Sequence, residues 1–446
     1  MKFRDFHPNI RIRIALNFFG SLIFNMVIPY MAIYFARELG AGIAGIALTG
    51  GVVLGFVTSF LSGYWSDRIG RKKLMVAGEL VWLSSYAIMA LSTSHWLDSP
   101  WLTLAAALGV NIGWGLFGPS SDGMMLDITK PDERKFMYSY FYWSNNLAIA
   151  LGGMLGAYWF DSHLTGLLIV LAVMSVVSAA VTVWKIGETY FPNREGGAEG
   201  AAAPASGFGA VLQSYGRVLR DRVFMLFMLS NLLILSSEFH LSNYVGVRLA
   251  DEMGVRSLFS WGELSISIDG VRMLGVLRTE NTLFVVLFSM FAVAAMRRFK
   301  EKQTLFAGMA LYVVGYAYQM YSNEPWLLIL AMALATWGEI VNVPIRMAYQ
   351  GSIAPDDARG AYMAIGSLSG TGSMMIGTLA VSLGAIAPSW SMGIVVLAVG
   401  GAGIGIFAGI IRQLDARTKE EAPDSAAGFA GSISSSASET VSSAGA

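Results

Sequence analysis

Residues 63–73 read GYWSDRIGRKK and directly follow a long apolar stretch. Gly63 and Gly70 permit close helix approach and a tight turn. Asp67 stands at the predicted end of the apolar helix, followed by a run of cations that includes Arg68, Arg71 and Lys72. Such a cluster can hold one conformation closed and release it when the pairing changes, so we expect it to act as a gate. We assign Arg134 and Arg359, which lie further along the chain, to the same gate. Ordinary positive charge at a membrane edge is the alternative, but that requires neither the acid nor the glycines.

The composition of the chain indicates a membrane protein. Hydrophobic residues occupy 55% of the 446 positions and charged residues only 13%, against roughly 25% in soluble domains. A membrane helix needs roughly 20 mostly apolar residues, which leaves room for about twelve spans. This composition excludes a soluble enzyme, a disordered chain and a nucleic-acid-binding protein, because the last would need a basic face. With no cysteine and four scattered histidines, we expect no cofactor and no metal site.

Apolar stretches follow one another along the chain. The first covers residues 14–35 and has no small-residue cleavage site, so it predicts a membrane helix rather than a signal peptide. The others centre near residues 52, 84, 112, 148, 174, 234, 289, 312, 337, 371 and 400. Because they are continuous rather than alternating, they predict helices and not a β-barrel. The expected fold class is therefore an all-α integral membrane protein with twelve transmembrane helices.

The positions of Lys and Arg predict the orientation of these helices. With the N-terminus inside, most of the 30 basic residues fall on the cytoplasmic side. One long external loop, from about residue 250 to 280, holds four of the others: Arg248, Arg256, Arg272 and Arg278. We therefore expect a multi-pass protein of the plasma or inner membrane, with both termini in the cytoplasm.

A linker and an internal repeat divide the chain into two bundles. Gly, Ala and Pro dominate residues 192–209, which predicts a flexible cytoplasmic linker over 191–212. Residues 1–190 and 213–418 would each form a six-helix bundle, and the Ser/Ala/Gly-rich tail over 419–446 is expected to be disordered. Three residue pairs share an offset of 225, namely Pro119 and Pro344, Arg134 and Arg359, and Gly152 and Gly377. Two such halves, pseudo-symmetric and with the substrate between them, are one of the transporter architectures.

The external loop between the seventh and eighth predicted helices carries a turn signal. It contains ISIDGVRML at residues 266–274, in which Asp269-Gly270 is flanked by alternating apolar and polar residues. This pattern is typical of a β-hairpin, so we predict a small extracellular hairpin with its turn at Asp269-Gly270. A disordered loop is the alternative.

Two acids lie inside predicted spans. Glu339 stands about thirteen residues into the tenth span, and Glu238 about sixteen residues beyond Arg222 in the seventh. An ionisable residue at the centre of a span costs roughly 2.5–3.5 kcal/mol on insertion scales, so it usually faces a cavity and has a function. We expect both acids to take part in proton and substrate binding. The alternative for each is a structural hydrogen bond to a neighbouring helix.

Other polar residues in the spans could contribute to the same site. His240 is expected near the external end as a polar lining residue. Arg346, one to two turns below Glu339, either pairs with it or anchors its helix at the membrane edge. Asn145 and Asn146 either line the cavity or form hydrogen bonds between helices.

These features together resemble the major facilitator superfamily, whose signature between spans two and three is matched by residues 63–73. Within it the chain resembles the LmrP-type proton/multidrug antiporters, over essentially the whole length before the tail. The passages are MMLDITKPDERK (124–135), YWSNNLAIALGGMLGAYWF (142–160), GVRML (270–274) and TWGEIVNVP (336–344). The resemblance implies that Asp67 and Asp127 belong to a cytoplasmic gating and proton-linked charge network, and that Glu339 binds protons and cationic substrates.

Two positions depart from the family pattern. Phe141 stands where the fifth span of the family has an acid, and Ser242 where the seventh span has another. Glu238 lies four residues before Ser242, and therefore on the same helix face.

We predict a secondary transporter that exports amphiphilic, often cationic compounds in exchange for protons by alternating access. Its partners would be protons, these small substrates and membrane lipids, but not nucleic acid, and we expect no enzymatic activity and a monomer. Proton-linked movement of a defined metabolite, peptide or lipid is the first alternative. A non-transporting receptor or a lipid scramblase is the second.

Overall fold

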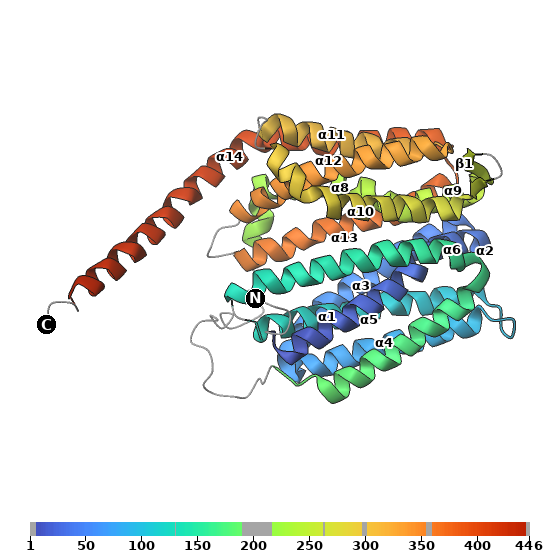
Figure 1. Ribbon diagram of the computed structural model, residues 1–446, viewed down its shortest axis with the longest axis horizontal. Helices are drawn as coiled ribbons and strands as arrows, with labels where there is room; N and C mark the ends of the chain where they lie inside the picture. The colour runs from blue at the N-terminus through green and yellow to red at the C-terminus, as the bar shows by residue number, and fades with distance from the viewer. Residues whose placement is uncertain are drawn as a thin grey trace.

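Helices form nearly all of the protein in the computed structural model (Figure 1), which describes residues 6–129, 131–189, 216–261, 264–296, 301–353 and 359–442. The N-terminal half contains α1 (Pro8–Val27), η2 (Ile28–Tyr30), α2 (Met31–Leu39), α3 (Ala41–Ile69), α4 (Arg71–Ser92), α5 (Pro100–Asp127) and α6 (Pro131–Lys185). The C-terminal half contains α8 (Arg222–His240), η3 (Leu241–Val245), α9 (Gly246–Glu252), β1 (Arg256–Trp261), β2 (Leu264–Ile268), α10 (Gly270–Met296), α11 (Glu301–Gln319), α12 (Pro325–Ser352), α13 (Arg359–Gly384) and α14 (Ser389–Ser442).

Eight helical segments among the described residues are long and apolar enough to cross a membrane. They are Pro8–Leu39, Ala41–Ser62, Arg71–Ser92, Pro100–Met125, Trp143–Lys185, Arg222–Glu252, Pro325–Met347 and Ser389–Thr418. The segment within α6 turns back on itself (Figure 1), because His163 has non-helical backbone angles of φ −138° and ψ 29°. The twelve predicted spans would also require α10, α11 and α13, so the number twelve stays a prediction.

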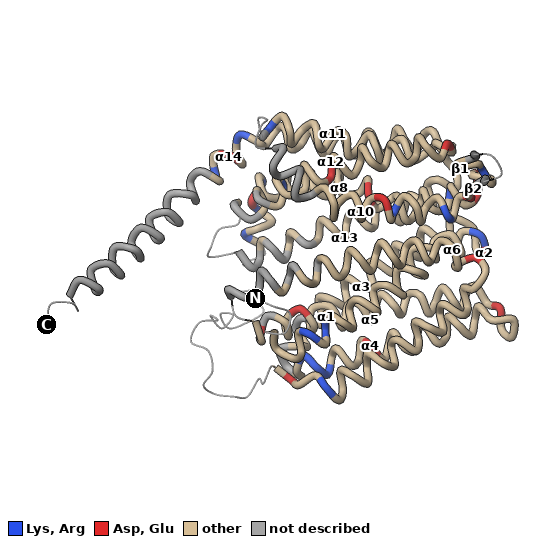
Figure 2. The backbone as a smooth tube through the Cα atoms, viewed as in Figure 1, with Lys and Arg blue, Asp and Glu red and all other residues tan. Residues whose placement is uncertain are grey.

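The two halves lie side by side, with most helices running in roughly the same direction (Figure 1). Charged residues gather toward the two ends of the helices, and few lie between (Figure 2). Large apolar side chains such as Phe19, Phe60 and Leu330 are more than half exposed. An apolar outer surface between charged ends suits a lipid bilayer.

α5 and α12 are equivalent helices in the two halves. Each has 28 residues and begins with Pro-Trp-Leu, at Pro100 and at Pro325. Each also contains an internal proline, Pro119 or Pro344, in the same position relative to its first residue. The repeat seen in the sequence therefore extends over the whole of these two helices.

α5 packs on α4, and α12 packs on α11, through the same kind of glycine contact. Gly113 of α5 meets Gly78 of α4, where an added Cβ would lie 3.1 Å from the Gly78 carbonyl oxygen. Gly338 of α12 meets Gly308 of α11, and there the corresponding distance would be 2.5 Å. In both halves a pair of glycines thus brings two helix backbones into direct contact.

The predicted position of the hairpin turn was wrong. β1 and β2 pair antiparallel, from Arg256 opposite Ile268 to Trp261 opposite Leu264, so the connection between them falls at residues 262–263, outside the described residues. Asp269-Gly270 instead joins β2 to α10, where Oδ1 of Asp269 accepts the backbone N–H of Arg272 at 2.9 Å. Asp-Gly is a hairpin signal, but an aspartate is equally suited to cap a helix N-terminus, and here the cap prevails.

The predicted linker, 191–212, lies outside the described residues. The disorder predicted for the tail over 419–446 stays a prediction, and α14 is assigned as a helix up to Ser442. Figure 1 shows this last part projecting away from the other helices.

Candidate functional site

A cavity lies between the two halves of the protein. It is lined by α6 from the N-terminal half and by α8, η3, α10, α11 and α12 from the C-terminal half. Its polar lining residues are Asn146, Glu238, Ser242, Arg278, Asn281, Thr282, Tyr316 and Glu339. It comprises about 940 Å³ of open space, and apolar side chains such as Phe239 and Leu241 complete its wall. A largely apolar cavity with a few convergent polar groups is the usual form of a small-molecule site.

Each acid in the cavity accepts a hydrogen bond from a neutral donor. Nδ2 of Asn281 donates to Oε2 of Glu339 at 2.8 Å and to Oγ1 of Thr336 at 3.0 Å. The hydroxyl group of Tyr312 donates to Oε2 of Glu238 at 3.0 Å. Within the described part of the chain, neither carboxyl group has a basic partner within 4.0 Å.

Two arginines near these acids, the half-buried Arg278 and the buried Arg346, bond to neutral oxygens instead. Arg278 donates from Nη2 to Oδ1 of Asn25 in α1 at 3.0 Å, and from Nη1 to the Ser242 hydroxyl. Arg346 donates from Nε to Oδ1 of Asn342 and from Nη1 to Oδ1 of Asn231, both at 2.8 Å.

The central site therefore combines acids and arginines that are not directly paired. Each of these charged groups has an amide or a hydroxyl group as its hydrogen-bonding neighbour. A proton or a cationic ligand can then be exchanged at Glu238 or Glu339 without breaking a salt bridge first. This arrangement suits a site whose charge changes during a cycle.

The structure brings some of the predicted site residues together and separates others. Glu238, Glu339 and Asn146 line the cavity, whereas Asn145 is not among its lining residues. Arg346 is 6% exposed and donates to Asn342 and Asn231, and among the described residues it forms no ion pair with Glu339 within 4.0 Å. His240 is 2% exposed, with Nδ1 2.6 Å from the Ser236 carbonyl oxygen one helical turn earlier, so it is a packed residue rather than a lining one.

Arg278 was wrongly assigned to the external loop. α10 begins at Gly270, so Arg278 lies inside this helix and lines the cavity. Arg248, assigned to the same loop, is 3% exposed in α9 and donates to the carbonyl oxygens of Gln319 and Ser322. Both arginines were misplaced because a basic residue lowers the hydropathy of a helix even when protein covers it.

Sequence reasoning also missed the neutral partners of the two acids. Asn281 and Tyr312 are common residue types in membrane helices, and nothing local distinguishes them. The only available signal was Arg278-Thr-Glu280-Asn281, a polar run directly before an apolar stretch.

The sequence around Gly70 forms a charge cluster at the opposite end of the helices from α9 and the hairpin. Asp127, at the end of α5, lies 2.9 Å from Nε of Arg71 and accepts the Thr189 hydroxyl at 3.0 Å. Glu188 accepts the backbone N–H groups of Arg71 at 3.2 Å and of Lys72 at 3.0 Å, and so caps α4. Asp127 therefore belongs to this cluster and not to the central cavity.

Gly70 itself connects α3 to α4 with φ +96° and ψ 151°, a conformation that essentially only glycine adopts. Lys72 donates from Nζ to the Val183 carbonyl oxygen at 2.8 Å. Gly63 lies within α3. The side chains of the remaining predicted gating residues lie outside the described residues: Asp67, Arg68, Arg134 and Arg359.

Between residues that the structure describes, at least four side-chain hydrogen bonds join the two halves. The Thr49 and Thr378 hydroxyl oxygens are 2.8 Å apart, and Ser382 donates to the Gly42 carbonyl oxygen at 2.7 Å. The other two run from Arg278 to Asn25, and from Thr279 to the Ala150 carbonyl oxygen at 3.2 Å. Gly42 and Ser382 lie at the ends of α3 and α13 that are remote from the Gly70 cluster. The halves are therefore tied together on the side opposite that cluster.

Solved structures share this fold at low sequence identity. A peptide transporter POT in complex with sulfate matches with a TM-score of 0.66 and 16% identity, over 92% of this chain and 96% of that one. A POT family transporter in complex with 5-aminolevulinic acid matches with a TM-score of 0.69 and 14% identity, over 92% and 97%. At such identities the likeness concerns the fold alone.

Two relatives match most of the chain in sequence. The "Na(+), Li(+), K(+)/H(+) antiporter" of Planococcus maritimus is 29% identical over 391 residues, which are 86% of this chain and 91% of that one. The "Multidrug resistance protein MdtH" of Yersinia enterocolitica is 26% identical over 369 residues, 79% of this chain and 80% of that one. The family model of the Major Facilitator Superfamily matches residues 14–268 and 249–442. The chain is a multi-pass membrane transporter and belongs to the major facilitator superfamily.

Proposed function

We propose that this transporter exports lipophilic, often cationic compounds in exchange for protons. It would work as a monomer in the plasma or inner membrane, with twelve spans in two bundles and both termini in the cytoplasm. The observation that carries the proposal is the placement of Glu238 and Glu339 in one cavity between the halves, without a salt bridge on either. Apolar side chains beside two carboxylates suit a ligand that is both lipophilic and positively charged.

Proton coupling would follow from competition at these two acids. When they are ionised, they attract a cationic compound, and when they are protonated, the attraction is lost and the compound can leave. Loading protons from the outside and releasing them inside would therefore drive export. In alternating access, the protein would open and close at two places. One is the set of bonds between the halves, and the other is the Gly70 cluster at the opposite end.

The similarity to the antiporter from Planococcus maritimus favours a second function, because the name of that protein gives Na⁺, Li⁺ and K⁺ as its substrates. The cavity offers hard oxygen ligands to such an ion, from Glu238 and Glu339 and from the Asn281 and Asn146 amides. Carboxylate and carbonyl oxygens are the ligands that alkali and alkaline-earth cations prefer. In that case the same two acids would exchange protons for Na⁺, Li⁺ or K⁺.

The test uses the full chain in proteoliposomes with a pH-sensitive dye inside. A lipophilic cation such as tetraphenylphosphonium is added in one arm, and Na⁺, Li⁺ or K⁺ in the others, and proton movement is followed. Proton movement with the lipophilic cation alone supports multidrug export, and movement with the metal ions alone supports the second function. A response to neither, but to one defined metabolite, peptide or lipid, would favour a narrower transporter.

Glu339→Gln and Glu238→Gln are expected to abolish the response of either kind. Glu324→Gln is the matched control, because this carboxylate lies outside the cavity, is 59% exposed and pairs with Arg256. Undiminished proton-coupled transport by Glu339→Gln would contradict both functions. A flux that ignores the pH gradient would point to a scramblase or a receptor instead.

A further inference from the structure

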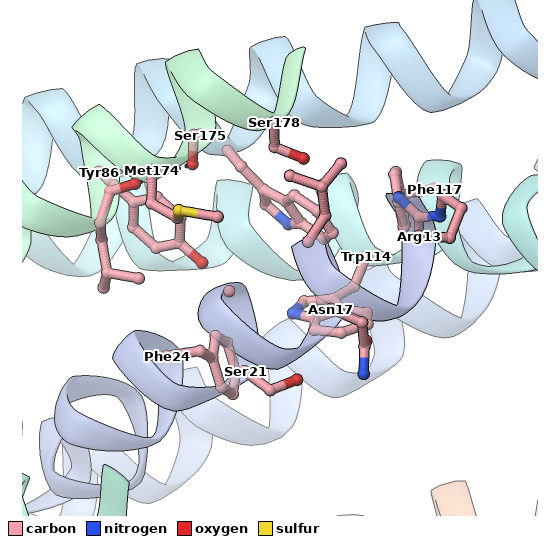
Figure 3. Close-up of a pocket in the computed structure, with 14 residues that line it drawn as sticks. Arg13, Asn17, Ser21, Phe24, Tyr86, Trp114, Phe117, Met174, Ser175 and Ser178 are labelled. Atoms are coloured by element: carbon pink, nitrogen blue, oxygen red, sulfur yellow. Dashed lines mark hydrogen bonds between the residues drawn. The ribbon is translucent and has the colours of Figure 1, made fainter. Parts of the chain in front are cut away.

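A second cavity lies within the N-terminal half, away from the two acids of the central site. It is bounded by α1, α4, α5 and α6 and comprises about 640 Å³ of open space. Figure 3 shows Arg13 and Phe117 at one end and Tyr86 and Met174 at the other. None of its lining residues is shared with the cavity between the halves.

Aromatic rings form one continuous wall of this cavity. Trp82 has ring centroids 5.0 Å from Trp114 and 4.8 Å from Phe117, and Trp114 lies 5.7 Å from Phe24. The Trp82 indole is fixed by a hydrogen bond of 3.1 Å from Nε1 to the Val110 carbonyl oxygen. Trp114 is different, because its side chain is 44% exposed although it lies among these rings. The wall thus has space beside Trp114 for one more flat group.

A buried cation, Arg13, lies at the end of the cavity where Phe117 also lies. Arg13 is 5% exposed, donates from Nη2 to the Ser121 hydroxyl at 2.9 Å and stands 4.5 Å from the centre of the Phe117 ring. Its Nε–H group has no acceptor among the described residues. A buried guanidinium group with an N–H that lacks a partner is costly, so a hydrogen-bond acceptor beside this side chain would be favoured.

Glu79, whose charge acts on Arg13 together with that of Asp122, is already engaged by two hydroxyl groups. Oε1 of Glu79 accepts the hydroxyl groups of Ser178 at 2.5 Å and Thr182 at 2.9 Å, and no ion pair with Arg13 forms within 4.0 Å. Glu79 balances the charge of Arg13 without occupying its Nε–H. The cavity is thereby left with the Arg13 guanidinium group at its polar end and rings along its side.

We propose that this cavity binds a flat aromatic molecule that carries a carbonyl or carboxylate oxygen. The ring would lie against Trp114 and Trp82, and the oxygen would accept a hydrogen bond from the guanidinium group of Arg13. Such a ligand is the opposite of the cation proposed for the central cavity, and this site does not depend on that function. The chemistry required is an acceptor oxygen on an aromatic ring, whether the oxygen is charged or not.

Equilibrium binding to the purified full chain in nanodiscs tests the proposal with three matched probes. They are 2-naphthoate, 2-naphthamide and 2-naphthylmethylammonium, which share the ring and differ in the attached group. The naphthoate and the naphthamide are expected to bind, and the ammonium compound to bind at least about tenfold more weakly, because its group is a donor and a cation facing Arg13. Absence of binding by the two acceptor probes, or equal binding of all three, would overturn the proposal.

Two substitutions locate the bound probe. Trp114→Leu and Arg13→Gln are each expected to weaken naphthoate binding about fivefold to tenfold or more. Trp96→Leu, at an 80% exposed position outside the cavity, and the double variant Glu238→Gln/Glu339→Gln should leave it unchanged. If Arg13→Gln does not fold, Trp114→Leu still tests whether the probe binds in this cavity. This variant is expected to fold because Trp114 is 44% exposed. Binding that survives Trp114→Leu but is lost in the double glutamine variant would place the probe in the central cavity and refute the second site.

Discussion

Thr49 of α3 and Thr378 of α13 place their hydroxyl oxygens 2.8 Å apart across the two halves of the chain. Arg278 and Asn25 form a second bond between the halves, with Arg278 also lining the central cavity. The contacts that hold the halves together are thus continuous with the wall of the proposed substrate site. A transporter that works by alternating access has to break them in each cycle.

A disulfide between positions 49 and 378 is expected to stop transport. The chain has no cysteine of its own, so the double variant Thr49→Cys/Thr378→Cys contains a single possible pair. Side chains whose oxygens are in hydrogen-bond contact lie within reach of disulfide geometry. Mild oxidation should abolish proton-coupled uptake in proteoliposomes, and a reductant should restore it.

The control for this crosslink joins two residues of the same half. The Ser92 and Thr103 hydroxyl oxygens are 2.7 Å apart, between α4 and α5. Ser92→Cys/Thr103→Cys should crosslink equally well and leave transport intact. If oxidation of the 49/378 pair is complete and transport continues, these contacts do not open during the cycle.

Tyr312→Phe is expected to reduce proton-coupled transport about tenfold. The substitution keeps the buried ring but removes the donor that contacts Oε2 of Glu238 at 3.0 Å. A hydrogen bond to a charged group is worth roughly 1.5–3 kcal/mol, and about 1.4 kcal/mol corresponds to a factor of ten. Transport rates of the two proteins at equal amounts in the membrane check this expectation. Tyr321→Phe, at a position 44% exposed and outside the cavity, is the control and should transport at the original rate.

The helical part of the fold was predictable because long apolar runs leave a chain few other choices. The internal repeat was also visible in the sequence, and the repeated residues Gly152 and Gly377 occupy equivalent positions in the two halves. An added Cβ would lie 2.3 Å from the Leu22 carbonyl oxygen at Gly152, where α6 packs on α1, and 2.7 Å from the Phe239 carbonyl oxygen at Gly377, where α13 packs on α8. Glycine at both positions is what close helix contact requires, and this requirement is visible in sequence spacing.

The arrangement of the candidate site was only half predictable. Glu238 and Glu339 are conspicuous, because an acid in an apolar run is costly and has to face something. Their partners Asn281 and Tyr312 are not conspicuous, because the contacts between α10 and α12 and between α8 and α11 arise only from the tertiary structure. Arg278 was misplaced for the same reason: its burial depends on α1 and η3, which are remote in sequence.

Gly70→Ala is expected to destabilise the protein more than Gly40→Ala. Both glycines have positive φ, +96° and +86°, with ψ near 150°, and such strain costs about 1–3 kcal/mol for other residues. Only at Gly70 would the new Cβ also meet a neighbour, at 2.6 Å from Oε2 of Glu188, the carboxylate that caps α4. Thermal unfolding in detergent should show a larger fall in midpoint for Gly70→Ala. Equal shifts would mean that the Glu188 cap moves aside freely.

Asp221 is the residue from which we expect a pH-dependent part of the stability. It caps α8 through the Phe224 N–H at 3.1 Å and accepts Arg417 Nη1 at 2.7 Å, Arg417 Nη2 at 3.0 Å and the Tyr362 hydroxyl at 2.8 Å. Partial burial raises the pKa of Asp221, but the hydrogen bonds from Arg417, the Phe224 backbone and Tyr362 outweigh it and hold the pKa below its usual value. The folded protein thus binds this proton more weakly than the unfolded chain.

Asp221→Asn is therefore expected to lower the thermal midpoint at pH 7 and to have a smaller effect in acid. Because the folded pKa is depressed, the stabilisation is complete above the unfolded value of about 3.9 and is lost as the pH falls through the folded pKa. Asparagine keeps the helix cap and loses the bidentate pair with Arg417, for which we expect about 1 kcal/mol. Unfolding in detergent between pH 3 and 7 should show the two curves converging toward low pH. Asp161→Asn removes the more exposed pair with Arg37 and serves as the control, with little change at any pH. A constant gap between Asp221→Asn and the original protein across this range would show that its charge does not contribute.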